Sequence, residues 1–436
     1  MCDQPNREKT SVELADIFVK NADAYIEQHG VSVVQNKAIK AISRCRTAVL
    51  GGHVARCNHC GIEEISYNSC RYRHCPKCQT IKQVQWLENR KTELLPVNYF
   101  HVVFTIPHEL NSIASYNPLV IYNLLFKAAW STIDTLGKDK KRLGGSMGML
   151  AFLHTWGQPL SQHIHLHCIL PGGALCDVDG QKEFRLSKSG FLFPVKVMSA
   201  LFGKIFLTLL QQAFTENELT FKGSIAELSE PTKFQELMAI LTLKSWNVFA
   251  KEPFHGAAGG LAYLARYVSK TAISNERILS FDNENVTFKW RDYSDNNKLK
   301  VMTLDVNEFI RRFLSHILPE GFMRVRSFGF LASACKTKNL NLIRALLLGN
   351  KKEVYTKNLE EVKEPIPEVD LCSSIDTREK EACTENLEKA KESTIDLIQR
   401  ILGIDITLCK HCKIGRLEII RTIPRTTQSL PYLDTS

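Results

Sequence analysis

The sequence contains 436 residues, enough for two or three domains that each bury a core of their own. Lysine and arginine number 56 against 46 aspartates and glutamates, so the net charge of +10 favours a polyanionic partner only slightly. The N-terminal stretch lacks the basic-then-apolar order of a signal peptide, and no apolar run approaches the length of a membrane span. We therefore expect a cytoplasmic protein without a membrane partner.

The first elements are two short helices and a cysteine-rich segment. Apolar residues at helical spacing predict the helices within residues 10–48. Five cysteines then crowd between Cys57 and Cys78, and without an export signal metal binding is the better reading than disulfides. Two C-x-x-C knuckles suit one tetrahedral, structural zinc ion, and its first-choice ligands are Cys57, Cys60, Cys75 and Cys78. Cys70 and His74 compete with these four, so a Cys3His set or a second partial site stays open.

Basic residues and tyrosines surround the knuckles, and few acids accompany them. Phosphates and bases could be bound by such a surface, although a solvated basic face has the same composition. The side chains that we expect to contact DNA in this segment are Arg71, Arg73 and Lys77.

The middle of the chain alternates strands and helices. A helical pattern covers residues 80–94, and an apolar strand over residues 100–106 ends at Pro107. A helix over residues 117–135 and a second apolar strand over residues 147–156 follow. This order predicts an α+β fold, in which helices cover one face of a sheet.

A third strand carries His163, His165 and His167 at alternate positions. Successive side chains of a strand face opposite ways, so the three imidazoles share one face while Ile164 and Leu166 take the other. Imidazoles that point the same way from a stiff strand are suited to bind a divalent cation. We expect a metal site on this face and a core on the other.

Two tyrosines lie on a later helix, after a mostly helical stretch over residues 191–249. Tyr263 and Tyr267 are four residues apart and therefore project from the same helix face, with Lys270 one turn beyond. Tyrosines on a helix usually belong to a core or an interface, so only their combination with the histidine strand favours catalysis.

The last third of the chain contains a predicted hairpin over residues 287–304, a helix over residues 309–318 and a basic strand over residues 321–326. Arginines make this segment a candidate nucleic-acid surface: Arg311, Arg312, Arg324 and Arg326. Beyond it, residues 350–397 are rich in lysine and glutamate, which is typical of a charged linker or an exposed helix that can be disordered.

A final knuckle, Cys409-Lys-His-Cys412, supplies one clear pair of thiolates. Cys372 and Cys383 could complete a second zinc site with it, but their spacing is loose, so the sequence does not favour that site.

Histidines and tyrosines together would support phosphodiester chemistry. A phenol with a pKa of ~10 is a poor nucleophile at neutral pH unless the attacked centre is made electrophilic. A divalent metal held by His165 and His167, with His163 or another polar group as third ligand, would do this as a Lewis acid. The sequence has no Walker A pattern, and strand transfer through a covalent tyrosine link needs no ATP.

In order and spacing, five phrases resemble the two-tyrosine HUH transposases of bacterial rolling-circle insertion sequences, which carry an N-terminal zinc-binding domain. The phrases are Tyr67-Asn-Ser-Cys70-Arg, Arg73-His-Cys75-Pro-Lys-Cys78-Gln, Phe100-His-Val-Val-Phe-Thr, His163-Ile-His-Leu-His-Cys and Tyr263-Leu-Ala-Arg-Tyr267. The resemblance covers residues 10–345 and implies a ferredoxin-like HUH nuclease core. It also implies Mg²⁺ or Mn²⁺ dependence, single-stranded DNA at transposon ends and target DNA as partners, and a nucleoid-associated place in a bacterial cytoplasm.

By the same resemblance, the paired metal ligands correspond to His165 and His167, and the nucleophiles to Tyr263 and Tyr267. A 5′-phosphotyrosine intermediate and a free 3′-hydroxyl would result. Ile164 stands where many members of that family have proline. A strand tolerates either residue at this position, so the difference does not weaken the resemblance. Two other functions compete: a non-catalytic zinc-dependent DNA-binding protein or inactive transposase relic, and a zinc hydrolase that uses His165 and His167.

The expected domain organisation has five parts. It comprises a helical and zinc-binding DNA-recognition domain (1–92), an HUH domain with the tyrosine helix (93–280), a basic hairpin and helix extension (281–345), a charged linker (346–400), and a C-terminal knuckle and tail (401–436).

Overall fold

The computed structural model describes residues 12–78, 85–86, 89–188, 190–254, 271–360, 396, 399–400 and 405–426. These residues form two compact units. The main unit comprises Met1–Leu50, Tyr67–Ile343 and Arg425–Ser436, and the second, which we call the split unit, comprises Gly51–Ser66 and Arg344–Pro424.

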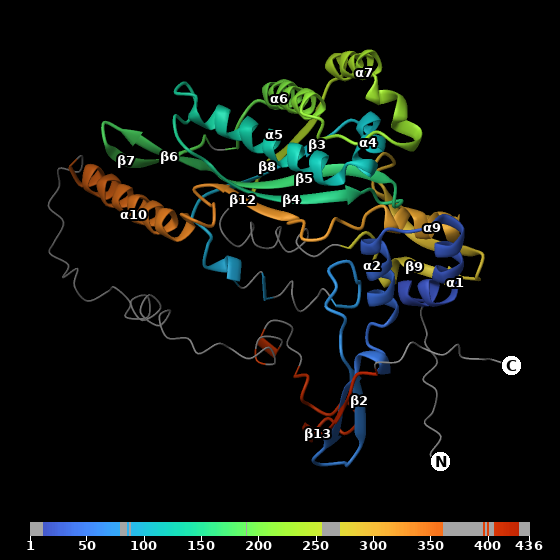
Figure 1. Ribbon diagram of the computed structural model, residues 1–436. Helices are drawn as coiled ribbons and strands as arrows, with labels where there is room; N and C mark the ends of the chain where they lie inside the picture. The colour runs from blue at the N-terminus through green and yellow to red at the C-terminus, as the bar shows by residue number, and fades with distance from the viewer. Residues whose placement is uncertain are drawn as a thin grey trace, which may run out of the picture. The chain divides into compact units, whose positions relative to one another are not determined.

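A five-stranded antiparallel sheet is the centre of the main unit, and its strands follow the order β12-β4-β5-β3-β8 (Figure 1). The strands are β3 (Tyr99–Thr105), β4 (Gly148–Trp156), β5 (Gln162–Pro171), β8 (Asn247–Phe254) and β12 (Val325–Gly329). A hairpin of β6 (Gly173–Val178) and β7 (Gln181–Leu186) follows β5 directly.

Helices cover one face of this sheet: α4 (Asn111–Tyr116), α5 (Pro118–Lys138), α6 (Val195–Thr215) and α7 (Pro231–Leu243) (Figure 1). Alternate residues of the strands supply the core beneath them, as the period-two pattern requires. Phe104 of β3 and Leu166 of β5 are fully buried there, and the Phe104 ring packs 4.9 Å from that of Phe202 on α6. The opposite alternate residues of β3, β4 and β5, which include the histidines, share the other face.

Helix α6 is the one described helix that is long and apolar enough to cross a membrane. In this structure Phe202 and Phe206 of α6 are buried in the core against Trp246. Gly203 permits this close approach, since a Cβ there would lie 2.7 Å from the Trp246 ring. Packing against the sheet therefore accounts for the apolar residues of this helix.

A second core in the main unit joins the N-terminal helices to residues 272–314. The elements around it are α1 (Leu14–His29), α2 (Val33–Ser43), α9 (Val306–Leu314) and a sheet of β9 (Ile278–Phe281), β10 (Asn285–Asp292) and β11 (Lys298–Asp305). Phe18 of α1 meets Phe313 of α9 edge to face at 5.5 Å. Ser32 caps α2 by accepting a hydrogen bond from the Gln35 amide, which fixes where this helix begins.

The split unit is a three-stranded sheet in the order β13-β1-β2. It brings β1 (Gly52–Cys57) and β2 (Glu63–Tyr67) together with β13 (Leu417–Ile423) from the other end of the chain (Figure 1). Helix α10 (Lys336–Glu360) precedes β13 in the chain.

The predicted α+β class, with helices on one face of an antiparallel sheet, is confirmed. Two strands differ from the prediction: β8 begins at Asn247 inside the stretch expected to be helical, and β12 lies at Val325–Gly329 rather than at residues 321–326. Of the expected linker, residues 346–360 are helical and residues 361–395 lie outside the described residues.

The compact units also cross the expected domain boundaries. Within residues 281–345, β10, β11 and α9 share a core with α1 and α2, while β12 is an edge strand of the main sheet. These elements therefore do not form an extension of their own. Long-range pairing of this kind leaves no trace in the local sequence pattern.

Candidate metal centres and active site

Three histidines converge on the open face of the main sheet. His165 and His167 come from β5, and His154 comes from β4, where it pairs directly with His165. Their ligand nitrogens all lie within 4.8 Å of one another, and the Nε2 atoms of His165 and His167 are 3.1 Å apart. Two imidazole nitrogens that bind one ion at ~2.1 Å are separated by ~3 Å, so this geometry fits a shared metal.

His163 contributes its backbone carbonyl to this group, and its ring packs 4.7 Å from that of His165. The Nδ1–H of His165 donates to the carbonyl oxygen of His163 at 2.8 Å, which leaves Nε2 of His165 as the nitrogen with a free lone pair. The His163 side chain is exposed, and the three-histidine group contains His154 in the position that we expected His163 to fill. His163 lies near the start of β5, two residues before His165.

His101 of β3 supports the second ligand. Its Nε2 lies 2.9 Å from Nδ1 of His167, and the two rings stack with centroids 5.1 Å apart. This contact directs Nε2 of His167 towards His165, as outer-shell partners of metal-binding histidines do. Burial lowers the pKa of His101 to about 4 and that of His165 to about 3, so both imidazoles are neutral at physiological pH, which is the metal-binding form.

Neither His154 nor His101 was predicted from the sequence. His154 stacks on Trp156 at 4.8 Å, two residues along the same strand, and Phe152 pairs with His167. A histidine between aromatic residues at period two on an apolar strand was the available signal. His101 lay in a strand expected to be buried, and only strand pairing brings it beside His167.

The predicted nucleophiles Tyr263 and Tyr267, and Lys270, lie outside the described residues. The chain before them is described. Phe249 of β8 pairs with Val103, which in turn pairs with His167, so Phe249 shares the histidine face of the sheet. Strand β8 ends at Phe254, nine residues before Tyr263.

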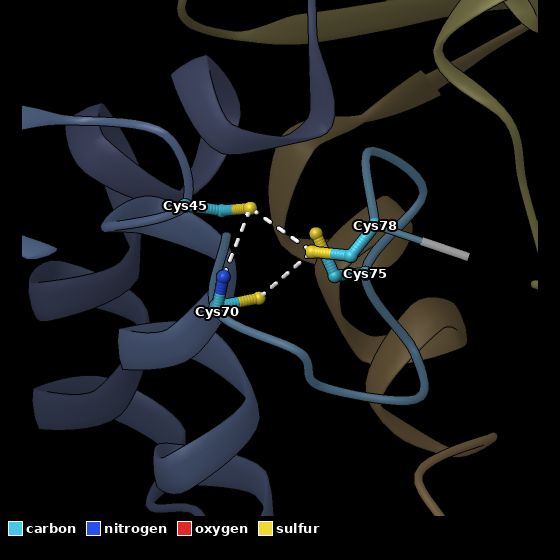
Figure 2. A group of neighbouring side chains, drawn as sticks. All are labelled: Cys45, Cys70, Cys75 and Cys78. Atoms are coloured by element: carbon cyan, nitrogen blue, oxygen red, sulfur yellow. Dashed lines mark hydrogen bonds between the residues drawn. The ribbon is translucent and has the colours of Figure 1, made fainter. Parts of the chain in front are cut away.

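Four cysteine thiols form a buried cluster beside the second core (Figure 2): Cys45, Cys70, Cys75 and Cys78. The Sγ of Cys78 lies 3.1 Å from that of Cys45 and 3.3 Å from that of Cys70. Hydrogen bonds from the neighbouring thiols lower the pKa of Cys78, whereas the same crowding raises the pKa of Cys75. Four thiols in such close contact can all be ionised together only when a cation lies among them.

The expected zinc quartet is therefore not the one that the structure brings together. Cys75 and Cys78 group with Cys45 and Cys70, while Cys57 and Cys60 group with Cys409 and Cys412 of the C-terminal knuckle. The reason is the turn of β1 into β2, which carries Cys57 and Cys60 into the split unit. Cys45, two residues after the end of α2, stands alone in the sequence, so no local pattern marks it as a ligand.

His74, the alternate ligand, is buried and accepts a hydrogen bond from the Leu318 amide at 3.4 Å. Burial lowers its pKa to about 3. The His74 imidazole therefore binds a backbone amide of the main unit and is not part of the thiol group. Cys372 and Cys383 lie outside the described residues.

Several basic residues expected on a DNA surface hold the main unit together instead. Arg73 donates to the carbonyl oxygens of Phe322 and Pro319, at 2.5 and 2.7 Å. Burial lowers the pKa of Arg324 to about 10, and Arg326 lies over the Phe126 ring at 4.3 Å. A guanidinium enclosed in this way contributes to packing.

Three of the remaining basic candidates form ion pairs. Lys77 forms an ion pair with Glu13, and Arg311 and Arg312 both bind Glu308. Arg311 has the most exposed side chain of these, at 61%. Arg71 adopts a positive φ of 55° directly after Cys70, so it belongs to the turn that shapes the thiol cluster.

Comparison with known proteins gives two matching families. Residues 148–339 match the family described as "Putative transposase", and residues 17–106 match the family described as "Transposase zinc-binding domain". The second range includes every cysteine of the buried cluster, and the first includes His154, His165 and His167. No solved structure matches.

Two curated relatives are similar over most of their length. "Putative transposase y4qJ" of Sinorhizobium fredii is 45% identical over 340 residues, which cover 78% of this chain and 85% of the relative. "Transposase for insertion sequence element IS801" of Pseudomonas savastanoi pv. phaseolicola is 25% identical over 313 residues, which cover 71% and 73% of the two chains.

Proposed function

Because this chain belongs to a family of transposases and carries their zinc-binding domain, we propose that it cleaves and rejoins single-stranded DNA at the ends of an insertion sequence. In this reaction a tyrosine attacks a phosphodiester, and the products are a 5′-phosphotyrosine link and a free 3′-hydroxyl. Rolling-circle transposition would follow from repeated transfer of this kind.

The observation that carries the proposal is the convergence of three imidazoles on one open sheet face. His154, His165 and His167 would together hold one divalent cation. Such a cation supplies Lewis-acid stabilisation of the charge that builds on the phosphate. Imidazole nitrogen suits Mn²⁺ better than Mg²⁺, so we expect Mn²⁺ to support activity at lower concentration.

The residues have separate tasks in this proposal. His101 keeps His167 in the orientation that directs Nε2 to the site, and the His163 carbonyl does the same for His165. Tyr263 and Tyr267 supply the attacking phenol oxygens: the new bond joins phosphorus to the tyrosine oxygen, and the bond between phosphorus and O3′ breaks. The leaving 3′ oxygen takes a proton as the phenol loses one. Lys270 would stabilise the phosphate charge.

The test is a covalent adduct. Full-length protein is incubated with labelled single-stranded oligonucleotides that carry the DNA flanking its gene, with Mg²⁺ or Mn²⁺, and resolved under denaturing conditions. We expect a protein-linked label that requires metal and is lost in the double variant Tyr263→Phe/Tyr267→Phe. Peptide mass analysis of the adduct then assigns the attacking tyrosine.

Absence of an adduct under every metal condition, with DNA binding intact, would instead support a zinc-dependent DNA-binding protein without catalysis. An adduct that survives in the double tyrosine variant would refute the assigned nucleophiles. Arg311→Ala tests the DNA surface separately, since its loss should weaken DNA binding and its dependence on salt.

A further inference from the structure

We propose that Cys57, Cys60, Cys409 and Cys412 form a second structural zinc site, in which the two knuckles come from opposite ends of the chain. The C-terminal knuckle lies outside both ranges matched by the families, residues 17–106 and 148–339. The proposal does not depend on the DNA chemistry.

The distances between the thiols fit a tetrahedral ion. The Sγ atoms of Cys57 and Cys412 are 3.6 Å apart, and those of Cys60 and Cys409 are 3.7 Å apart. Four thiolates that bind zinc at ~2.3 Å in a tetrahedron are ~3.8 Å from one another. All four ligand atoms lie within 4.8 Å of one another, and all four cysteines are free.

The two knuckles have the same local structure. Each reads Cys-x-His-Cys, and the residue after the second cysteine has a positive φ, 74° at Gly61 and 56° at Lys413. In each, the amide of that residue donates to the carbonyl of the first cysteine, at 3.0 Å for Gly61 and 2.9 Å for Lys413. A turn of this shape directs two sulfurs to one point, which is the geometry of a zinc knuckle.

Backbone amides also point at the sulfurs. The amides of His59 and Cys60 donate to Sγ of Cys57 at 3.4 and 3.5 Å, and the Gly415 amide donates to Sγ of Cys412 at 3.4 Å. Hydrogen bonds from amides stabilise the thiolate over the thiol and so favour the metal-binding form.

The polypeptide around the cluster is shaped to bring the knuckles together. Strands β1 and β13 pair from Gly52↔Ile423 to Cys57↔Leu417, so their pairing ends at the cluster. The Asn58 amide donates to the Arg416 carbonyl, and the Arg416 amide donates to Asn58 Oδ1 at 2.9 Å. A Cβ at Gly415 would overlap Sγ of Cys57, so only glycine permits this approach.

Among the described residues of β1, β2 and β13, the buried apolar side chains other than cysteine are Val54 and Ala55, at 1% and 8% exposure. On β2 and β13, Ile65, Ile419 and Ile420 are 45%, 66% and 47% exposed, and neither large core cluster includes a residue of these strands. A small sheet with so little burial generally depends on an additional crosslink. Zinc bound by both knuckles provides that crosslink, and makes the C-terminal segment necessary for the N-terminal knuckle.

The first experiment counts zinc in the purified, reduced full-length chain. Because the three-histidine group could also retain zinc, zinc is counted in a His167→Ala background. There we expect two zinc ions per chain, and one after each of Cys57→Ser, Cys412→Ser and the double substitution Cys57→Ser/Cys412→Ser. Cys335→Ser, a half-buried cysteine outside both groups, is the matched control and should retain two. If the double variant lost both zinc ions, the two cysteines would belong to different sites and the proposal would be overturned. A single zinc ion without any cysteine substitution would overturn it as well.

A second experiment does not require a ligand to be deleted. Cys412→His keeps a metal ligand, so the Co²⁺-substituted chain should still bind two ions while the thiolate-to-cobalt absorption falls by about one eighth, one of eight cobalt–sulfur bonds. Gly415→Ala should lower zinc content to one without removing any ligand. An unchanged cobalt spectrum in Cys412→His, or two zinc ions in Gly415→Ala, would contradict a zinc site shared by the two knuckles.

Discussion

At the scale of single residues, the proposed metal site depends on whether His154 or His163 supplies its third ligand. His154 lies with His165 and His167, whereas the ring of His163 is exposed. We expect His154→Ala to lower adduct formation by about 100-fold or more, since one metal ligand is lost. His163→Ala should retain most activity because the backbone carbonyl that orients His165 remains.

Because His154 is buried against Trp156, His154→Ala should also lower the urea midpoint. Both variants are therefore assayed where circular dichroism shows that each is fully folded, which separates a catalytic effect from loss of fold. If His163→Ala loses as much activity as His154→Ala, the third ligand is not the one that the strand pairing indicates. Initial rates of adduct formation at several Mn²⁺ concentrations provide the measurement.

A second prediction at this scale concerns His316, which is buried beside Leu160 and Thr155. Its Nε2 lies 3.0 Å from the Leu160 carbonyl oxygen, and burial lowers its pKa to about 4. The unfolded state, with a pKa of ~6.5, binds a proton first as the pH falls, so the native state loses stability from about pH 6.5 down to about pH 4.

Between pH 7 and pH 5 this one group should reduce the free energy of unfolding by roughly 1–2 kcal/mol. His316→Gln, which does not titrate, should be less stable at pH 7 but lose less stability on acidification than the unmodified chain. Urea midpoints at the two pH values measure this difference. Equal acid sensitivity in both proteins would mean that His316 is accessible to protons in the native state.

At the scale of elements, β12 joins the main sheet through a close approach of two glycines, Gly148 and Gly329. Gly329 has a φ of 61°, and a Cβ there would overlap the Met147 carbonyl oxygen. We expect Gly329→Ala to destabilise the main unit by about 2 kcal/mol or more, from backbone strain and overlap together.

Gly180 is the matched control for this substitution, because its φ of 81° is also positive but a Cβ there would meet no other atom within 4 Å. Gly180→Ala should therefore cost only the backbone preference, about 1 kcal/mol. Urea unfolding of both variants makes the comparison. A cost at Gly329 no larger than that at Gly180 would show that β12 shifts to accommodate the methyl group.

Elements also mark where sequence reasoning succeeds. The buried strands β3, β4 and β5 and the helix α5 follow from apolar runs and periodicity, which are local properties. The edge strands β8 and β12 lie beside Gly- or Arg-containing segments without clear alternation, and pairing rather than local pattern makes them strands. The third histidine is a similar case. Alternation along β5 predicts His163, whereas the pairing of β4 with β5 brings His154 beside His165.

At the scale of the whole molecule, the metal sites are assembled from residues distant in sequence. The C-x-x-C pattern correctly indicated zinc, but spacing alone paired the nearest knuckles, Cys57–Cys60 with Cys75–Cys78. The partners that the structure brings together, Cys45 and Cys70 for one knuckle and Cys409 and Cys412 for the other, depend on strand pairing and helix packing. Loop closure over long distances costs little more than over short ones, so nearness in sequence is a weak guide.

The cysteine group next to the second core leads to a prediction about the whole main unit. Cys45, Cys75 and Cys78 belong to the same core as α1, α2 and α9. Removing zinc with a strong chelator under reducing conditions leaves thiols that repel one another when ionised and are costly to bury. We expect faster amide hydrogen exchange in these helices and in residues 45–78, while the five-stranded sheet around His165 keeps its protection because its core is separate.

Hydrogen exchange followed by mass spectrometry locates the change, and adding zinc back should restore protection. Without chelator, Cys70→Ser should show the same faster exchange in α1, α2 and α9 but leave β1, β2 and β13 protected, because their cysteine group is intact. Cys335→Ser should match the unmodified chain. Equal loss of protection in β4 and β5 would mean that both cores unfold as one cooperative unit. Unchanged exchange in α1 and α2 would mean that the thiol group does not need a metal. If the expected outcome holds, zinc stabilises the core formed by α1, α2 and α9, and the five-stranded sheet that carries the histidines folds without zinc.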